Sequence, residues 1–375
     1  MVLIGILIVF VALILLQRVV YRHLWRRNLT VDLKFSAKTG IEGSSVWLTE
    51  VITSRKALPL PWLAVKFQVS RYLVFPDHKH AAVTDDYYRE DLFSLGMYQR
   101  ISRTLRVNLK KRGYFTIKSI DLVSSDLLLT RKLVGHAESL SVLTVTPRLI
   151  AREELDIPYR QLIGQVLMRK ALLPDPFEFR SIREYQSFDT LKSVNWLATA
   201  RTGQLKVNVN EYTASRDVLI LLNVESDGAF YEELLIEEGI RVASSLCEYL
   251  VADGISCGLI SNARDIITGE AIEISAGQSI QHVQQVQEQL GRLDLSRSPA
   301  HFDILLEDKS FDWKHEPILL MISFNCSEKI CRAWTRCLDQ GFEGLWIIPR
   351  YADQLDRLPE IDDHIFCWEV KRLVD

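Results

Sequence analysis

The first 21 residues hold the longest apolar run in the chain. Residues 2–16 carry no charged or strongly polar side chain, and the run continues through Gln17 and Arg18 to Tyr21. About 20 helical residues span about 30 Å, which is the thickness of the hydrocarbon core of a bilayer. No comparable run follows. The sequence therefore predicts a single membrane-spanning helix over residues 1–21.

The flanks of this run separate a retained anchor from a cleaved signal peptide. A signal peptide has a basic segment before the apolar run and a small-x-small cleavage site after it. Here only the terminal amine precedes the run, and residues 19–22 (VVYR) close it. A buried core helix is disfavoured because the segment is apolar on every face. We therefore expect a signal anchor that stays attached.

Local charge predicts the orientation of this anchor. Arg18, Arg22, Arg26 and Arg27 cluster on its C-terminal flank. Positively charged flanks remain in the cytoplasm. We therefore expect a single-pass protein of the cell membrane, with the bulk of the chain cytoplasmic. The reverse orientation would instead favour an extracytoplasmic binding protein.

Composition excludes several classes of protein. The 375 residues are 48% hydrophobic and 25% charged, with a net charge of −3. These values are those of an ordinary globular chain of two or three domains, and they exclude a disordered one. The near-neutral balance gives no reason to expect nucleic-acid binding. The six cysteines include no C-x-x-C pair, so a zinc ribbon or a redox motif has no support.

Periodicity divides the rest of the chain, and the predicted fold class is a multidomain α+β protein. Residues 29–148 show period-two alternation interrupted by turn residues, as at Leu63, Val65 and Phe67, which predicts an antiparallel β-sandwich. Residues 149–176 form a connector and residues 177–212 a distinct segment. Residues 213–375 alternate buried strands with helices, which predicts a doubly wound α/β domain with a mostly parallel sheet.

The distinct segment is expected to contain one short helix. Asp189 is a suitable N-cap for a helix over residues 190–201, and Gly203 is placed to end it. Trp196 lies within an apolar pattern and is expected in the core.

Known catalytic motifs are absent from the sequence. It contains no P-loop, no dinucleotide-binding glycine pattern, no G-x-S-x-G elbow and no H-E-x-x-H. Ligands of open α/β sheets bind beyond the carboxyl ends of the strands. At those ends lie Asn223, Glu225 and Asp227, and later Asn325. These oxygens could hold Mg²⁺, although a polar loop that caps the following helix explains them with fewer assumptions.

One set of residues in the distinct segment resembles a known family. Arg183-Glu184-Tyr185, Asp189, Asn195-Trp196 and Thr199-Ala200-Arg201 match in register the signature of the bacterial family called domain of unknown function 58. The chain has Phe188 where many members have glycine, which indicates a sub-branch. The resemblance covers nearly the whole chain. Within the family, the chain resembles a clostridial-type member with a single membrane span.

This resemblance implies a fold, a partner and no catalytic activity. Members carry N-terminal membrane helices, a β-rich domain, the signature and a von Willebrand factor A-like domain, and they are grouped with AAA+ ATPases of the MoxR type. The implied function is a membrane-linked adaptor for such an ATPase. The alternatives are a hydrolase or transferase that uses Glu225 and Asp227, or the extracytoplasmic binding protein named above.

The resemblance also leads to expectations about Mg²⁺ binding and about the role of the signature residues. The metal-dependent adhesion site of von Willebrand A domains needs Asp-x-Ser-x-Ser, where this chain has Asn223-x-Glu225-x-Asp227. A later aspartate of that site corresponds to Asn325. We expect weak or absent Mg²⁺ binding, because a carboxylate is lost. Arg183, Asp189 and Arg201 either lock the short helix onto the α/β sheet or present a docking surface.

Overall fold

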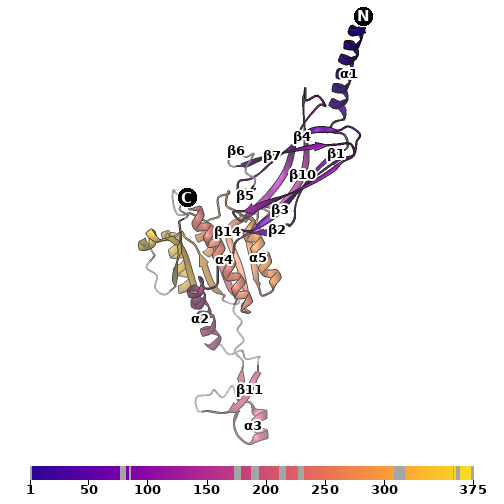
Figure 1. Cartoon of the computed structure of the whole chain (residues 1–375). Helices are drawn as coiled ribbons and strands as arrows, with labels where there is room; N and C mark the ends of the chain where they lie inside the picture. Colours follow the sequence, from indigo (N-terminus) through magenta and orange to yellow (C-terminus); the bar gives the residue numbers. More distant parts are fainter. Residues whose placement is uncertain are drawn as a thin grey trace. The chain divides into compact units, whose positions relative to one another are not determined.

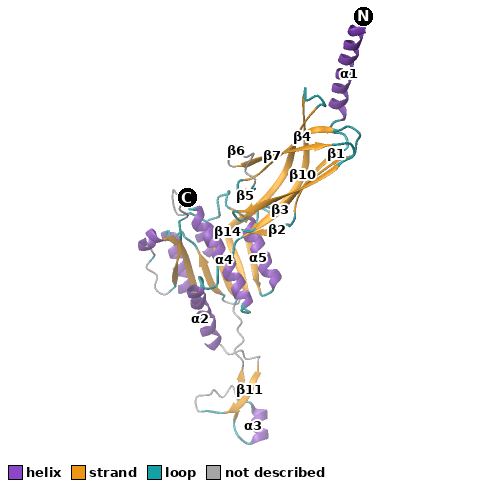
Figure 2. Cartoon of the chain, viewed as in Figure 1, coloured by secondary structure: helices purple, strands orange, loops and turns teal. Residues whose placement is uncertain are grey.

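The computed structural model of the chain is of the α+β class, with an apolar N-terminal helix and several β-sheets (Figures 1 and 2). Two compact units are present. One comprises residues 1–148 with 290–292, and the other residues 149–289 with 293–375. The structure describes residues 2–76, 82–83, 86–172, 179–186, 194–210, 217–226, 232–307, 317–357, 359 and 364–372.

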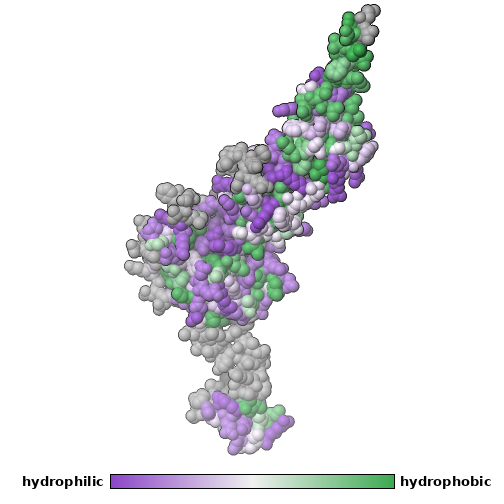
Figure 3. All heavy atoms as spheres, in the orientation of Figure 1, coloured by the Kyte–Doolittle hydropathy of each residue, from purple (hydrophilic) through white to green (hydrophobic). Residues whose placement is uncertain are grey.

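Helix α1 (Val2–Leu24) is the apolar N-terminal segment. Within the described residues it is the one helix long and apolar enough to cross a membrane, and a signal sequence would share these properties. Figure 3 shows it as a mainly hydrophobic surface. The helix does not end where the apolar run ends. Tyr21 and Trp25 are buried in the β-sandwich core, and the Tyr21 hydroxyl donates to the backbone oxygen of Pro59 at 2.8 Å.

Two sheets form the predicted sandwich. The order in one is β1 (Leu29–Phe35), β3 (Ser45–Ser54), β8 (Arg100–Leu109) and β5 (Leu73–Val74). The order in the other is β2 (Thr39–Ile41), β10 (Lys132–Thr146), β9 (Gly113–Ser125), β4 (Leu60–Ser70), β7 (Asp86–Leu95) and β6 (Ala82–Val83). All described pairings are antiparallel except that of β2 with β10.

The core of the sandwich consists of the side chains that the alternation predicts. Val31 and Leu33 on β1, Leu63 and Phe67 on β4, and Val107 on β8 are all buried in one apolar cluster that includes residues of both sheets. Period-two alternation places these side chains on the inner faces, because successive residues of a strand point to opposite sides. The prediction of a sandwich is therefore confirmed.

A charged cluster is buried within this sandwich. Asp91 on β7 accepts hydrogen bonds from Arg89 at 2.5 and 3.1 Å, and Arg103 on β8 reaches it at 2.8 Å. Glu50 on β3 is fully buried, and neither of its oxygens has a hydrogen-bond partner of normal geometry among the described residues. The pKa of Glu50 is raised to about 8, first by burial and then by the nearby Asp91, while Arg89 and Arg103 oppose the shift.

The second unit contains a mostly parallel sheet. Its order is β15 (Ala271–Gly277), β14 (Cys257–Asp265), β13 (Val218–Leu222), β17 (Ile318–Ile322), β18 (Gly344–Tyr351) and β19 (Ile365–Val370), with β16 (Leu293–Asp294) beside β14. The helices are α2 (Asp156–Leu172), α4 (Glu233–Ala252), α5 (Ile280–Arg292), α6 (Phe302–Glu307), α7 (Glu328–Asp339) and the 3-10 helix η3 (Ala352–Arg357).

Helices cover both faces of this sheet. Gly239 of α4 approaches Ile322 of β17, whereas Trp334 of α7 belongs to the cluster that contains Leu319 and Met321 of the same strand. Adjacent strand residues point to opposite faces, so α4 and α7 lie on opposite sides. From the central β13 the chain adds β14 and β15 on one side, then β17, β18 and β19 on the other. This is the doubly wound order, with β15 as an antiparallel edge.

The distinct segment forms a small module of its own elements. Strands β11 (Phe179–Glu184) and β12 (Lys206–Asn210) pair in antiparallel fashion, and α3 (Trp196–Thr202) lies between them in sequence. The prediction of a helix over residues 190–201 is wrong at its start. Val194 forms a β-bridge with Val207, so the backbone is extended there and the helix begins two residues later.

We predict that Glu50 makes the sandwich less stable as the pH rises from about 4.5 to about 8. The folded protein keeps the proton on Glu50 up to about pH 8, whereas the unfolded chain releases it near 4.5, the ordinary pKa. The folded state therefore binds the extra proton in this window, and the free energy of unfolding falls there by up to about 1.4 kcal/mol per pH unit. Above about pH 8 this contribution is constant.

Calorimetry of the detergent-solubilised full chain at several pH values tests this. The Glu50→Gln variant should not show the decline in the free energy of unfolding. The difference between its melting temperature and that of the wild type should therefore increase in favour of the variant from pH 5 to pH 8. The matched control is Glu90→Gln, which removes an exposed carboxylate paired with Lys66 at 2.9 Å and should follow the wild type. Identical pH profiles for wild type and Glu50→Gln would refute the assignment.

Candidate functional site

The carboxyl ends of the two central strands carry a network of neutral side chains. Asn223 follows β13, Ser323 follows β17, and Asn262 lies on β14; all three are buried. Asn223 Nδ2 donates to Ser323 Oγ at 2.9 Å, and Asn262 Nδ2 donates to Asn223 Oδ1 at 2.9 Å. This edge lies at the topological switch point, where doubly wound sheets bind ligands.

The network also organises the backbone of the loops around it. Asn262 Oδ1 accepts from the backbone N–H of Val224 at 3.0 Å, and Asn262 Nδ2 donates to Ala300 O at 2.9 Å. Asn223 Oδ1 accepts from the N–H of Glu225 at 2.8 Å, and Asn325 Oδ1 accepts from the N–H of Ser327 at 2.9 Å. The amide groups therefore hold these loops in place. The interpretation of a polar loop that caps the following helix is not borne out, because the N-cap position of α4 is Glu232, which makes no side-chain cap hydrogen bond.

Glu225 points away from this network. Its Oε1 contacts His301 Nδ1 at 2.9 Å, and its Oε2 accepts from the backbone N–H of Phe302 at 3.0 Å, at the start of α6. Its carboxylate therefore fixes the segment before α6 to the loop after β13. Asp227, the other acidic candidate, lies outside the described residues.

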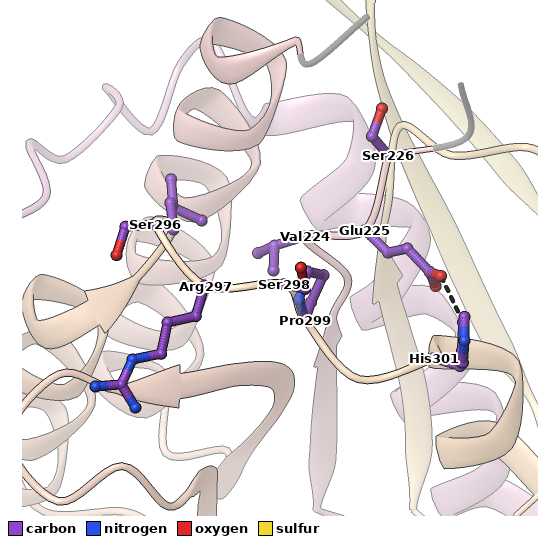
Figure 4. A pocket seen from close by; sticks show the side chains of 9 residues that line it. Val224, Glu225, Ser226, Ser296, Arg297, Ser298, Pro299 and His301 are labelled. Carbon is purple, nitrogen blue, oxygen red and sulfur yellow. Dashed lines mark hydrogen bonds and ion pairs between the residues drawn. The ribbon is translucent and has the colours of Figure 1, made fainter. Parts of the chain in front are cut away.

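A cleft of about 360 Å³ opens beside the contact between Glu225 and His301 (Figure 4). The loop after β13 provides one wall with Val224, Glu225 and Ser226, and residues 295–299 with His301 provide the other. Figure 4 shows the Ser226 hydroxyl directed away from His301. The lining of the cleft is mixed, with the apolar side chains of Val224 and Leu295, the acidic Glu225, and the basic Arg297 and His301.

The described residues at this edge do not fit a resident Mg²⁺ ion. Mg²⁺ is held through carboxylates in octahedral geometry. Here the Oδ1 atoms of Asn223 and Asn325 already accept backbone hydrogen bonds, and the carboxylate of Glu225 is engaged by His301 and Phe302. Among the described residues no group of three or more His, Cys, Asp or Glu side chains could hold a metal.

The signature residues lie in the β11–α3–β12 module, apart from Asp189, which is outside the described residues. Arg183 and Tyr185 are half-buried, at and just beyond the end of β11, and Arg183 donates to Glu184 O at 3.0 Å. Asn195 Oδ1 accepts from the N–H of Ala198 at 2.9 Å, so Asn195 is the N-cap of α3, the role predicted for Asp189. Gly203 ends the helix with φ of 72°, as predicted.

The expectation that Trp196 lies in the core is wrong. Its side chain is 66% exposed, the next residue Leu197 is 67% exposed, and Arg201 is also exposed. Helix α3 contains no buried residue. With only seven residues it has too little surface to cover all its apolar side chains. Two large apolar side chains therefore face solvent in a helix whose ends are both capped.

Sequence reasoning missed three members of the sheet-edge site. Asn262, Ser323 and His301 were not singled out. Ser323 lies two residues before Asn325, so a search of both strand ends for small polar residues could have found it. Asn262 is inside a strand, and only the register of β14 with β13 brings it to Asn223. His301 follows a loop and lies next to Ala300, whose backbone oxygen accepts a hydrogen bond from Asn262.

Comparison with known proteins assigns no family. No family model matches the chain, and no curated protein matches it. Among solved structures it is similar to the CARDB domain of the PF1109 protein from Pyrococcus furiosus, with 14% identity and a TM-score of 0.21 over 31% of this chain and 86% of that one. It is also similar to a non-cellulosomal cohesin from Archaeoglobus fulgidus, with 9% identity and a TM-score of 0.23 over 35% and 97% of the two chains.

We predict that Asn262→Ala lowers the stability of the α/β unit by on the order of 2 kcal/mol, because the buried N–H of Val224 and the buried amide oxygen of Asn223 lose this partner. For a unit of this size the melting temperature should fall by roughly 4–8 °C. Calorimetry measures the shift. Ser298→Ala, at an exposed position of the neighbouring cleft, is the control and should stay within about 0.5 kcal/mol of wild type.

We also predict that the protein does not bind Mg²⁺ in the micromolar range. Isothermal titration of the full chain in detergent with MgCl₂ should give only the heat of dilution. A double variant, Asn223→Asp with Asn325→Asp, restores two carboxylates and should bind Mg²⁺ more tightly than wild type. Tight binding by the wild type would show that the amide edge is a metal site after all.

Proposed function

We propose that this chain is a membrane-anchored adaptor of the domain of unknown function 58 family, which docks a AAA+ ATPase of the MoxR type and has no catalysis of its own. The observation that carries the proposal is the exposed pair Trp196 and Leu197 on the doubly capped helix α3 of the family signature. Three parts of the structure support the proposal: the anchor helix α1, the docking helix α3 and the edge of the α/β sheet.

The continuity of α1 with the sandwich supports a retained anchor. Cleavage after the apolar run would cut close to Tyr21 and Trp25, which are core residues of the sandwich. Lys56 Nζ donates to the backbone oxygens of Leu24 and Trp25 at the end of the helix, which further ties the helix to the domain. Removal of α1 would therefore damage the fold that follows it. The arginines on this flank support a cytoplasmic location for the rest of the chain.

The geometry of α3 supports docking. Tryptophan is enriched among the residues that contribute most of the binding energy at protein interfaces. It makes this contribution when its side chain enters a pocket of the partner. The caps at Asn195 and Gly203 hold α3 in one conformation, so little conformational entropy is lost on binding. The exposed Arg201 on the same helix adds a charge that could pair with an acidic partner.

The α/β unit supports the family assignment and a non-catalytic role. The doubly wound order with one antiparallel edge strand is compatible with a von Willebrand A-like domain. In that reading the adhesion-site position is occupied by the neutral amides Asn223 and Asn325. Contact with a partner at this edge would then proceed without a bridging cation.

A second candidate is a hydrolase or transferase that uses the cleft. The Glu225–His301 pair is the observation that favours it, because a carboxylate that orients an imidazole is part of many general-base systems. Against it, the Ser226 hydroxyl points away from His301 (Figure 4). Loss of a measurable hydrolytic activity in His301→Ala would establish this second function.

The adaptor proposal predicts that Trp196→Ala weakens ATPase binding without lowering the melting temperature. The full chain and the MoxR-type ATPase of the same organism would be co-expressed, solubilised and co-purified, and recovery of the ATPase quantified. Loss of an interface tryptophan commonly costs 2 kcal/mol or more, which corresponds to roughly a 30-fold weaker complex.

Two variants control this experiment. Trp47→Ala removes another exposed tryptophan, on β3 of the sandwich, and should leave recovery unchanged. Asn195→Ala removes the cap of α3 and should weaken binding while destabilising the helix by about 1 kcal/mol. Failure of the wild-type chain to recover the ATPase would reject the adaptor function, and equal recovery with Trp196→Ala would reject α3 as the docking element.

A further inference from the structure

The turn between β9 and β10 carries three consecutive exposed leucines. Leu127, Leu128 and Leu129 are 53%, 51% and 65% exposed. A patch of contiguous large apolar side chains on a hairpin tip is unusual for a surface that faces only water. Its place on the sandwich indicates what covers it.

The structure holds this turn in one conformation. The carboxylate of Asp126 accepts hydrogen bonds from the backbone N–H groups of Thr130 at 2.6 Å and Arg131 at 3.1 Å, and from the Thr130 hydroxyl at 2.5 Å. Leu129 donates its N–H to Asp126 O at 3.0 Å and has φ of 56°, a left-handed conformation that is uncommon for leucine. The leucines are therefore displayed by a defined scaffold.

The same turn lies against α1. Asp126 lies close enough to Tyr21 of the helix for an electrostatic interaction, and the side-chain amide atoms of Gln17, one turn earlier, are buried. The helix and the turn both belong to the unit that contains the sandwich. The helix is exposed along most of its surface, but Ile14, Gln17 and Tyr21 are partly or fully covered, on one face by their spacing of three and four residues. From Tyr21 to Ile14 the helix rises about 10 Å. The turn therefore stands alongside the segment that would enter the membrane.

Exposed basic side chains lie close to this apolar tip in the sequence and on α1. They are Arg131 at the end of the turn, Lys132 directly after it, and Arg18 and Arg22 on α1. Figure 3 shows a mixed surface, with hydrophilic and hydrophobic residues side by side, where α1 joins the sandwich. Interfacial membrane contacts commonly combine apolar side chains that enter the bilayer with basic side chains at the level of the lipid headgroups. The basic side chains attract anionic lipids.

We propose that the turn of residues 126–131 is a second membrane contact, which inserts its three leucines into the bilayer beside α1. The inference rests on the proposed anchoring by α1. Because the turn is fixed to the sandwich, insertion at two points restricts rotation of this domain about the helix axis. A lipid bilayer is the occupant, since the turn adjoins the one described helix that is able to span a membrane.

Site-directed spin labelling of the full chain tests the proposal. Nitroxide would be attached at Leu128→Cys in protein reconstituted into vesicles of phosphatidylcholine with a minority of phosphatidylglycerol. The background would replace Cys326, Cys331 and Cys367, the native cysteines that are not fully buried. Collision rates with oxygen and with a water-soluble nickel complex then report whether the label lies in lipid or in water.

Two further positions make the outcomes distinct. Val11→Cys, on the exposed part of α1, reports the anchor, and Leu140→Cys, 78% exposed on β10 of the same sandwich, reports the aqueous environment. We expect the labels at 128 and 11 to show several-fold lower nickel accessibility than the label at 140. A lipid-exposed label at 11 with an aqueous label at 128 would overturn the second contact and leave the anchor intact. Aqueous labels at both positions would overturn both.

Discussion

The structure depends on the junction at which an apolar helix becomes part of a β-sandwich core. Residues of α1 that follow the apolar run do not form a linker, because Tyr21 and Trp25 pack inside the sandwich. A Cβ atom at Gly135 would lie 2.9 Å from the Trp25 ring, so glycine is needed there for the indole to fit. Lys56 donates to the last carbonyl groups of the helix, where a cation is favoured, although burial lowers its pKa to about 8. The sandwich therefore has one end fixed to the proposed anchor.

Local patterning was sufficient to predict most of the fold. In the sandwich the alternating apolar residues of β1, β4 and β8 are buried as expected. When one face of a strand is buried and the other faces solvent, the alternation in its own sequence shows which face is apolar. The continuous apolar runs at β13 and β17 were equally informative, since both faces of these strands are covered.

Local patterning failed where the structure depends on partners distant in sequence. Apolar spacing suggested that Trp196 was buried, but a seven-residue helix beside a two-stranded sheet offers no second layer to bury it. The buried ionisable residues Glu50, Arg89 and Asp91 lie on strands whose sequence alternation is otherwise ordinary. Arg89 and Asp91 are two residues apart on β7, but only the packing of the two sheets brings Glu50 of β3 to them. The role of Asn262 follows from strand register, which no single segment encodes.

The chemistry of the sheet edge connects these parts to function. At a switch point a catalytic or metal-dependent protein needs groups that are charged or that can move protons. This chain places amides and hydroxyls there that pair with one another and with the backbone, and the acidic Glu225 beside them is engaged by His301 and by the backbone N–H of Phe302. Its exposed apolar residues at 127–129 and on α3 are instead held by hydrogen-bonded scaffolds, through Asp126 and through Asn195. Rigid display of apolar side chains suits a protein that binds surfaces, because the entropy of ordering them has already been lost on folding.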